Sequence, residues 1–542
     1  MNRGVPLPGS VERELGKGDS LAGENALALA ASDLQALEAL HQPLWLIQGE
    51  EPVGLTLTRK SISDMDFRGY IPALQPHRLG DMSFCSDHNL KFAYMAGAMA
   101  NGIGSAEIVI AMGQAGMLGS FGAAGLDPVE VEAAILQIKA ALPYQTFAVN
   151  LIHAPSEPAW EERVVDLFLK HKVHLVEASA YLNLSPAIVR YRTHGIHQDA
   201  SGRIVTPHRV IGKVSRLEVA NKFLAPPPEK ILAQLVEEGH LTHRQAELAR
   251  MIPMAQDLSA EADSGGHTDN RPALALLPTM QALVAKVQAQ NPAYPRLRVG
   301  LGGGIATPAS ACAAFAMGAA FVLTGSVNQA CREAGTSDIV REMLAQTGQA
   351  DITMAPAADM FEMGVKLQVL KRGTMFAMRA AKLYEFYRTY SRLEDLPADD
   401  LAWLEKTIFH KSVTQVWQDT VAFFQQRDPS QIERANRDEK HKMALVFRWY
   451  LGQSSNWANR GILARKIDFQ IWCGPAMGAF NEWTAGSHLA LPEQRKVVAV
   501  AQNILFGAAV LTRAHQARQQ GVAIPPFTPQ PKPPEALKEY FS

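Results

Sequence analysis

Glycines follow two neighbouring apolar segments, where they could bind an anion. Gly302-Gly303-Gly304 comes after one predicted strand, and Thr324-Gly325-Ser326 ends the next. Residues without a Cβ let backbone N–H groups approach an anion closely. A helix predicted to begin at Thr307-Pro308 adds the positive potential of its N-terminus. The two turns therefore predict a phosphate site, and the alternative is that the glycines only make tight turns. No G-x-G-x-x-G followed by an acidic residue supports a dinucleotide site.

A histidine lies beside acidic residues and glycines at the end of another apolar segment. Glu261 and Asp263 precede Gly265-Gly266-His267. His267 could donate a proton near neutral pH, because the unperturbed pKa of histidine is about 6.5. The two glycines would let the backbone pass close to a planar ligand. An equally good interpretation is that His267 caps the following helix or bonds a backbone carbonyl.

Small or polar residues end three further apolar segments. The turn at Met95-Ala96-Gly97 begins a stretch rich in small residues, which would pack closely on a flat ring or simply fill the core. Asn150 and Lys213 lie near strand ends, where polar side chains can bond a ligand instead of being buried at a cost. For Lys213, an internal ion pair with Glu177 is an equally good interpretation.

These residues need a scaffold that gathers strand ends in one place. Between Lys91 and Ser326, short apolar runs alternate with helical patterns eight times, as in parallel strands buried on both faces. A (β/α)8 TIM barrel needs roughly 250 residues and commonly binds phosphate after strands seven and eight. The glycine turns follow those two strands, which favours the α/β barrel over an open doubly wound sheet. The predicted strands are Phe92–Ala96, Met117–Phe121, Thr146–Leu151, His174–Ala178, Arg209–Val214, Asp257–Ala262, Leu297–Leu301 and Phe321–Thr324.

The chain before and after the barrel differs from it in composition. Residues 1–40 predict a partly disordered lead, and 42–85 predict a small β-rich segment. The barrel would occupy 91–354, with a partly helical insertion at about 221–253. Residues 355–542 hold six of the eight tryptophans and predict a mostly helical accessory domain. A second interpretation is that parts of this region cap the barrel mouth.

Composition argues against several classes of function. The 542 residues carry 52 Lys+Arg and 53 Asp+Glu, a net charge of -1, without the basic excess of nucleic-acid or polybasic membrane proteins. Gln502 and Asn503 interrupt the most apolar segment, so no transmembrane helix is expected. The four cysteines are far apart, and no H-E-x-x-H, Walker or triad motif occurs. We therefore expect neither a disulfide framework nor a metal site, and a cytoplasmic protein.

Long motifs in the chain resemble one known family. The segments Phe92–Leu126, Glu261–Pro272 and Gly300–Gln329 are similar to the PfaD family of FMN-dependent, trans-acting enoyl reductases of polyunsaturated fatty acid and polyketide synthases. That family belongs with the nitronate monooxygenases and FabK-type reductases. Lys442–Trp483 also resembles PfaD proteins and is absent from the shorter nitronate monooxygenases. The resemblance extends from residue 42 to about residue 520.

The resemblance implies FMN across the barrel mouth. Its phosphate would be bound at Gly303, Gly304, Gly325 and Ser326, its ring would pack on the turn that begins at Met95, and Asn150 and Lys213 would bond its polar edge. Lys213 would stabilise negative charge at N1 of the reduced flavin. The implied cofactor-binding set is Met95, Ala96, Gly97, Asn150, Lys213, Gly265, Gly266, Gly302, Gly303, Gly304, Gly325 and Ser326.

The resemblance also implies a reaction and partners. NADPH would reduce FMN, and hydride would reach the β-carbon of a 2,3-enoyl thioester while His267 polarises or protonates the substrate. The substrate would arrive on an acyl carrier protein of a separate synthase, docking at a rim made by the helical region or by the 221–253 insertion. A homodimer is left open. The alternatives are a flavin monooxygenase acting on nitronates and a non-catalytic flavoprotein.

Overall fold

The computed structural model describes residues 31–47, 54–56, 67–155 and 157–542. Most of the predicted 1–40 lead lies outside these residues, and the described part of it includes helix α1 (Ala31–Glu38). Strands β1 (Leu44–Ile47), β2 (Gly54–Thr56) and β3 (Phe67–Ile71) form an antiparallel sheet in the order β2-β1-β3. This sheet falls where the sequence predicts a small β-rich segment.

Eight parallel strands close into a barrel in the order β10-β11-β13-β14-β4-β5-β6-β7. The prediction of a TIM barrel is confirmed, and each predicted strand overlaps one observed strand. Their side chains are almost all buried, because helices cover the outside and core residues fill the inside. The strands are β4 (Tyr94–Ala96), β5 (Leu118–Phe121), β6 (Ala148–Ile152), β7 (Leu175–Ser179), β10 (Arg209–Val214), β11 (Asp257–Glu261), β13 (Arg298–Gly302) and β14 (Val322–Thr324).

Capping residues set the starts of the barrel helices. Asp127 caps α4 with a capping box, while Ser185 and Thr307 cap α6 and α11, and each is followed by the proline that the sequence places at the first helical position. The helices around the barrel are α2 (Met82–Asp87), α3 (Ala106–Gln114), α4 (Pro128–Ala141), α5 (Pro158–Lys170), α6 (Pro186–Thr193), α7 (Leu217–Leu224), α10 (Ala273–Gln290), α11 (Pro308–Ala316), α12 (Ser326–Gln329) and α13 (Asp338–Ala345).

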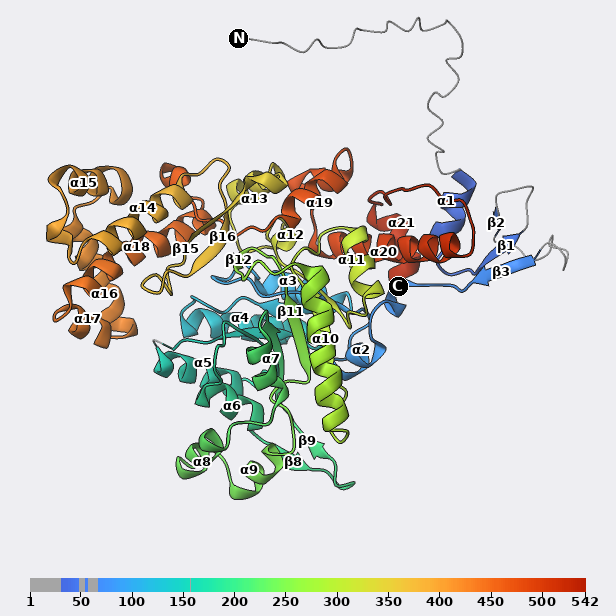
Figure 1. Cartoon of the computed structure of the whole chain (residues 1–542), viewed down its shortest axis with the longest axis horizontal. Coiled ribbons are helices and arrows are strands. Elements are labelled where there is room, and N and C mark those ends of the chain that lie inside the picture. Colours follow the sequence, from blue (N-terminus) through green and yellow to red (C-terminus); the bar gives the residue numbers. More distant parts are fainter. Residues whose placement is uncertain (1–30, 48–53, 57–66, 156) are drawn as a thin grey trace, which may run out of the picture.

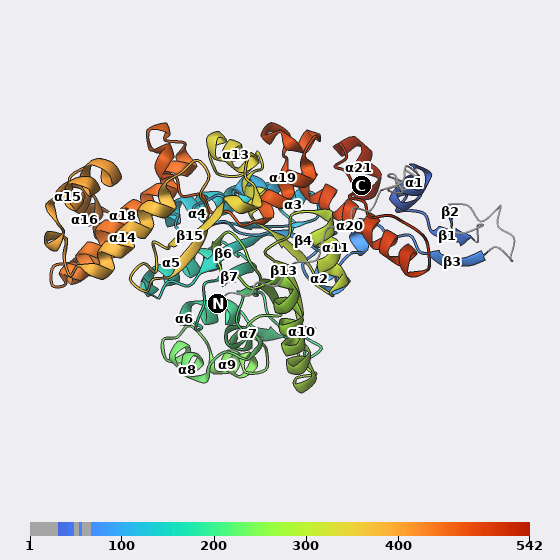
Figure 2. The same ribbon diagram turned by 45° about the horizontal axis from the view of Figure 1, so that its top comes forward.

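The 221–253 insertion contains α8 (Glu229–Glu237) and α9 (His243–Ala249), which contact α6. A two-stranded ribbon, β8 (His197–Gln198) and β9 (Ile204–Val205), lies near them. Figure 2 shows α8 and α9 at the end of the molecule opposite α13 and α19.

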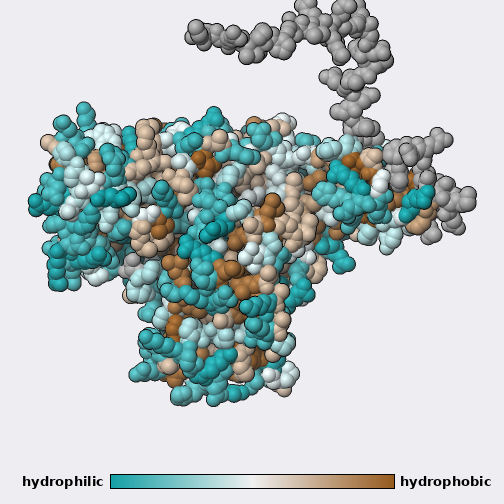
Figure 3. Space-filling model, in the orientation of Figure 1, coloured by the Kyte–Doolittle hydropathy of each residue, from teal (hydrophilic) through white to brown (hydrophobic). Residues whose placement is uncertain are grey.

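The chain after the barrel contributes to three separate hydrophobic clusters, one of them shared with the barrel. Helices α14–α18 surround a core that includes Leu383, Val416 and Phe447, and we call residues 376–460 the helical lobe. Figure 3 shows mostly hydrophilic side chains on the outer end of this lobe. Its helices are α14 (Phe376–Thr389), α15 (Ala398–Trp403), α16 (Val413–Arg427), α17 (Ser430–Ala435) and α18 (Glu439–Arg460).

The last helices return to the barrel and join its core. Helix α20 (Val497–Gln519) packs on α11, and Gly507 allows this approach because a Cβ there would lie 2.6 Å from Pro308. The region predicted as one accessory domain over 355–542 therefore divides, with the lobe on one side of the barrel and α20 and α21 (Pro534–Phe541) on the other (Figures 1 and 2). Helix α19 (Ala476–Thr484) contacts α12 and α13.

Helix α20 is the one helix in the described residues that is long and apolar enough to cross a membrane. Within its apolar window, 83% of the residues are buried inside the protein. Its apolar composition is thus used in packing against the barrel, as expected for the central helix of a core.

A short hairpin connects the barrel to the helical lobe. Strands β15 (Ile352–Pro356) and β16 (Lys366–Leu370) pair antiparallel, and β16 also pairs with β12 (Gly266–His267) from the loop after β11. The resulting sheet has the order β12-β16-β15. We call residues 352–370 the hairpin; it holds the backbone of His267 in register with Leu367.

Candidate functional site

A cavity of about 1400 Å³ lies between the carboxyl ends of the barrel strands and the helical lobe. Its wall comes from the loops after all eight barrel strands, from the hairpin and from the lobe. The structure thus supports the interpretation that part of the C-terminal region caps the barrel mouth. Ten of the predicted site residues line the cavity: Asn150, Lys213, Gly265, Gly266, His267, Gly302, Gly303, Gly304, Gly325 and Ser326.

The turn at residues 95–97 lies deeper than expected. Met95, Ala96 and Gly97 are buried and do not line the cavity; the wall is made by Ala98–Asn101 instead. Gly97 is needed for packing, because a Cβ on it would lie 2.6 Å from the Leu323 side chain of the adjacent strand. The stretch of small residues after β4 therefore reaches the cavity at Ala98–Asn101, while residues 95–97 lie behind that wall.

The two glycine turns lie side by side, because β13 and β14 are paired. Gly303 has φ +83° and faces the backbone of Ala262, so no other residue fits there without strain. At Gly304 and Gly325 an added Cβ would meet no protein atom within 4 Å. These two glycines therefore leave an open, backbone-lined space at the cavity wall, which is the form of an anion cradle.

Lys213 lies between two carboxylates on the barrel wall. Its Nζ is 3.1 Å from Glu261 Oε1 and 3.9 Å from Glu177 Oε1. Burial alone would lower the pKa of Lys213, but the two carboxylates outweigh it and raise the pKa to about 12. The internal ion pair with Glu177 is confirmed, and Lys213 still presents a permanent cation at the cavity.

Glu177 is fully buried and accepts hydrogen bonds from the loop after β4 and from β6. Burial raises the pKa of Glu177, and Lys213 opposes that rise. Its Oε2 accepts the backbone N–H of Ala98 at 2.8 Å, and its carbonyl accepts Nδ2 of Asn150 at 3.0 Å. Asn150 also donates to Ser179 Oγ at 2.9 Å. The polar side chains at the ends of β6, β7 and β10 are therefore joined by hydrogen bonds and an ion pair.

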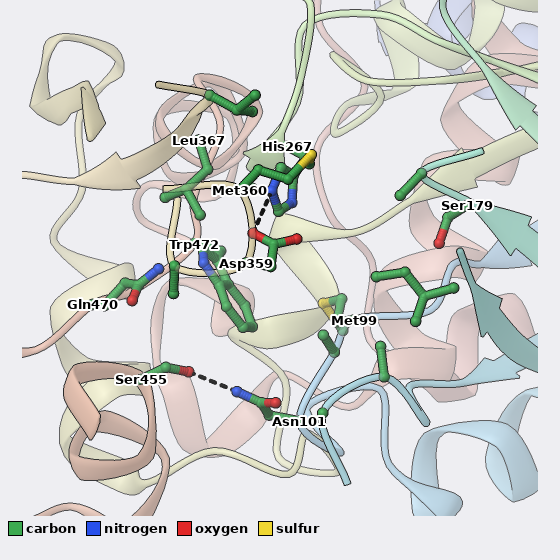
Figure 4. Close-up of a pocket in the computed structure, with 18 of the residues that line it drawn as sticks. Met99, Asn101, Ser179, His267, Asp359, Met360, Leu367, Ser455, Gln470 and Trp472 are labelled. Atoms are coloured by element: carbon green, nitrogen blue, oxygen red, sulfur yellow. Dashed lines mark hydrogen bonds and ion pairs between the residues drawn. The ribbon is translucent and has the colours of Figure 1, made fainter. Parts of the chain in front are cut away.

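His267 pairs with a residue of the hairpin. Its Nε2 lies 3.1 Å from Oδ1 of Asp359, and the two side chains are 35% and 49% exposed (Figure 4). Burial alone would lower the pKa of His267, but Asp359, with help from Glu261, raises it. Burial would likewise raise the pKa of Asp359, and His267 lowers it. The pair favours a protonated imidazole beside an ionised carboxylate.

The loop that carries His267 is packed against distant chain segments. A Cβ on Gly265 would lie 2.9 Å from the backbone of Cys473, so this glycine allows another stretch of protein to pack against the loop. The backbone N–H of Gly474 donates to Ser326 Oγ at 3.0 Å. The 473–474 segment therefore contacts both the histidine loop and the glycine turn after β14.

Several cavity residues are not among the predicted site residues, although Met99 and Asn101 fall in the stretch of small residues after the first barrel strand. Trp472 and Met99 lie on the wall near the His267–Asp359 pair, and Asn101 donates to Ser455 Oγ of the lobe at 2.9 Å (Figure 4). His153 also lines the cavity, with Nδ1 3.2 Å from the buried carboxylate Glu161. The clustering of tryptophans after residue 400 is the one feature of the sequence that hints at a contribution of this region to the site.

The insertion and the cysteines lie outside the site. No residue of 221–253 lines the cavity, so the rim is made by the lobe and not by the insertion. All four cysteines are free and buried. Among the residues that the structure describes, no group of three His, Cys, Asp or Glu side chains could hold a metal ion.

Known proteins share parts of this architecture. The model of the inserted helical domain of [acyl-carrier-protein] S-malonyltransferase matches residues 390–469, within and just beyond the lobe. The crystal structure of the enoyl reductase domain of MlnA, from the macrolactin cluster of Bacillus amyloliquefaciens, matches with a TM-score of 0.78 and 40% identity, covering 82% of this chain and 99% of that one. The chain belongs to the family of this enoyl reductase domain.

Two curated relatives place the family in larger proteins. The chain is 49% identical over 460 residues to a polyunsaturated fatty acid synthase component of Thraustochytrium sp., which is 83% of this chain and 31% of that protein. It is 45% identical over 434 residues to the polyketide biosynthesis protein PksE of Bacillus subtilis, with 80% and 56% covered. The chain thus spans between a third and about half of these two relatives.

Proposed function

We propose that this chain is a PfaD-like enoyl reductase that uses FMN and NAD(P)H to reduce the 2,3-double bond of an enoyl thioester. The observation that carries the proposal is the cavity itself, which combines an open glycine cradle, a cation and a histidine in a chain 40% identical to an enoyl reductase domain across 99% of that domain. Fold alone would not support a reaction, because barrels host many chemistries.

The residues of the cavity fit FMN. Gly304 and Gly325 face open space and would receive the phosphate on backbone N–H groups. Lys213, held cationic by Glu177 and Glu261, would bond the ring where negative charge accumulates on reduction. When bound, FMN supplies the two-electron transfer from the nicotinamide to the carbon–carbon double bond. Ala98–Asn101, which line the cavity, would face the ring in place of residues 95–97.

The protein's own side chains account for substrate positioning and proton supply. His267, protonated and paired with Asp359 through Nε2, has one N–H left for the substrate, which would either polarise the thioester carbonyl by a hydrogen bond or supply the proton that the α-carbon needs. The hairpin and lobe would cover the reacting atoms and keep water out, which strengthens these interactions. Arg427 supports this closure, because it joins the lobe to Glu157 of the barrel loops at 2.7 Å.

We further propose that the substrate arrives on an acyl carrier protein of a polyketide or polyunsaturated fatty acid synthase, in the cytoplasm, and that the reductase acts in trans. The names of the two curated relatives support the pathway class. The match of 390–469 to a helical domain of an enzyme named for acyl carrier protein supports a lobe that meets the carrier. The lobe lines the cavity, so a carrier bound to the lobe would hold its phosphopantetheine arm close to the site.

An anaerobic colour test decides between reductase and oxygenase. The purified yellow protein is bleached with NADPH without oxygen and is then mixed with crotonyl thioester or with a nitronate. A reductase regains its colour with the thioester alone. A monooxygenase needs no nicotinamide, so NADPH would leave its yellow colour unchanged, and the protein would consume the nitronate only after oxygen is admitted. A colourless protein that does not bind FMN would contradict both.

A further inference from the structure

The hairpin holds the backbone of the histidine loop from one side. Gly266 and His267 pair with Gln368 and Leu367 across the β12–β16 contact. The Gln368 side chain also donates to Asp263 Oδ1 at 2.9 Å and to the carbonyl of Ser264 at 2.8 Å. The loop that follows β11 is therefore shaped by a segment about a hundred residues later in the chain.

The same hairpin supplies the partner of the imidazole. Asp359 lies between β15 and β16, and its Oδ1 is 3.1 Å from His267 Nε2. An ionised carboxylate only accepts hydrogen bonds, so Nε2 must carry the proton in this contact. Within the described part of the chain, Nδ1 of His267 has no hydrogen-bond partner. The geometry leaves Nδ1 as the nitrogen that can exchange a proton in the cavity.

Other charges near His267 are already engaged elsewhere. Glu261, on β11, pairs with Lys213 on β10 at 3.1 Å. Arg448, on α18, pairs with Glu362 at 3.3 Å and contributes to the charge environment of Asp359. Of the carboxylates that face the imidazole, only Asp359 among the described residues bonds it directly.

We propose that Asp359 is the positioning residue of the active site, fixing the tautomer of His267 with Nε2 protonated and holding the ring toward the substrate. The hairpin then completes a histidine–carboxylate pair that the barrel alone lacks. This inference rests on the proposed function for its catalytic meaning. The geometry of the pair can be tested without any substrate.

The test measures how fast diethyl pyrocarbonate modifies His267 as pH is varied, read by mass spectrometry of its peptide in the full-length protein. The reagent attacks neutral imidazole, so the rate rises through the pKa of the ring. We expect D359N to move the midpoint to lower pH, and D359E to keep it near that of the wild type. Below both midpoints, the rate should rise about tenfold for each unit by which the midpoint falls.

The matched control is E362Q, because Glu362 is in the same hairpin but pairs with Arg448 and His441 instead of His267. The control should leave the His267 midpoint unchanged. If D359N does not fold, D359S gives the same measurement with a smaller neutral side chain. An unchanged midpoint in a folded neutral variant, or an equal shift in E362Q, would overturn the proposal.

Activity assays separate this inference from the proposed function. Reduction that needs protonated His267 declines as pH rises through its pKa, so the decline should move to lower pH in D359N. If D359N shifts the modification midpoint but the wild type does not reduce an enoyl thioester, the proposed function is wrong and the role of Asp359 toward His267 still holds. If the wild type reduces the enoyl thioester but D359N leaves the midpoint of His267 unchanged, the role of Asp359 is wrong and the proposed function still holds.

Discussion

The barrel mouth and the hairpin contribute different kinds of groups to one cavity. The barrel side offers backbone at Gly304 and Gly325 and a partly buried cation at Lys213. The hairpin side offers a half-exposed carboxylate, Asp359, and apolar side chains such as Met360. The first set suits an anionic, planar cofactor, whereas the second set suits control of a proton beside an apolar substrate.

The difference suggests a division of roles within the site: the barrel fixes the groups that bind the cofactor, and the hairpin sets the environment of the histidine that handles the proton. Groups on strand ends are fixed by the closed barrel and by buried pairs such as Lys213–Glu177. The His267 environment depends on the contact between a barrel loop and the hairpin, and its pair is open to solvent. Changes to the barrel mouth should therefore affect cofactor binding and stability, and changes at the hairpin should affect turnover and its pH dependence.

The largest effect is expected for H267Q, which keeps a polar side chain but cannot donate a proton as an acid. Turnover of an enoyl thioester should fall by about 10²- to 10⁴-fold, the usual contribution of a general acid, while FMN binding stays unchanged. Steady-state kinetics measure the turnover, and FMN titration measures the binding of the cofactor. The control is H197Q, an exposed histidine on β8 far from the cavity. Equal turnover in H267Q and the wild type would mean that another group donates the proton.

The next effect concerns the buried charges of the barrel mouth. In K213M, Glu177 remains fully buried beside Glu261 without its cation, which should lower the free energy of unfolding by about 3 kcal/mol at neutral pH. The loss should shrink at lower pH, because Glu177 has a raised pKa and becomes neutral there. Chemical denaturation measures it, with K170M as the control because Lys170 forms an exposed pair with Glu132. A loss no larger than that of K170M would show that the buried pair adds no net stability.

A smaller, specific effect is expected at the glycine cradle. G325D would place a carboxylate where the phosphate should bind, and like charges brought together cost several kcal/mol. FMN affinity should fall about 100-fold, while affinity for riboflavin, which lacks the phosphate, should change little. G325N is the matched control, because its side chain has the size of aspartate without the negative charge. Equal weakening of FMN and riboflavin in G325D would place the phosphate elsewhere.

The smallest effect lies at the rim, where Asp269 accepts hydrogen bonds from Arg216 and Ser215. The Arg216 hydrogen bond contributes most to lowering the pKa of Asp269 to about 2. A lowered carboxyl pKa stabilises the fold above the unfolded pKa of about 3.9 and loses this contribution as pH falls toward 2. Because Arg216 is half-exposed, the difference between wild type and D269N should be about 1 kcal/mol or less. If the free energies of unfolding of the wild type and D269N differed by the same amount down to pH 2, the difference would not come from the lowered pKa of Asp269.

The barrel and its strand-end residues could be predicted because their signals are local. Alternating strand and helix patterns and Asp-Pro or Ser-Pro starts determine the order of the elements, and glycine turns mark the ends of β13 and β14. The depth of residues 95–97 could not be predicted, since it depends on the contact of Gly97 with Leu323 across two strands. Likewise Asp359 is 92 residues from His267 in the chain, and only the β12–β16 pairing brings them together.

Sequence patterns also could not predict that the C-terminal region divides between the helical lobe and the helices that pack on the barrel. Helices α14–α18 and α20 are all amphipathic or apolar helices, and composition does not say which core each one joins. Gly507 against Pro308 and Trp472 against the hairpin are tertiary contacts that decide it.

Our proposal is that one cavity, built from barrel and hairpin, reduces an enoyl group. It is tested most directly by incubating the yellow protein anaerobically with enoyl-loaded acyl carrier protein and NADPH, and reading the mass of the acyl chain. The expected result is a gain of two hydrogens with the wild type and a strongly slowed gain with H267Q. An acyl mass that never changes, with FMN bound and NADPH present, would contradict it.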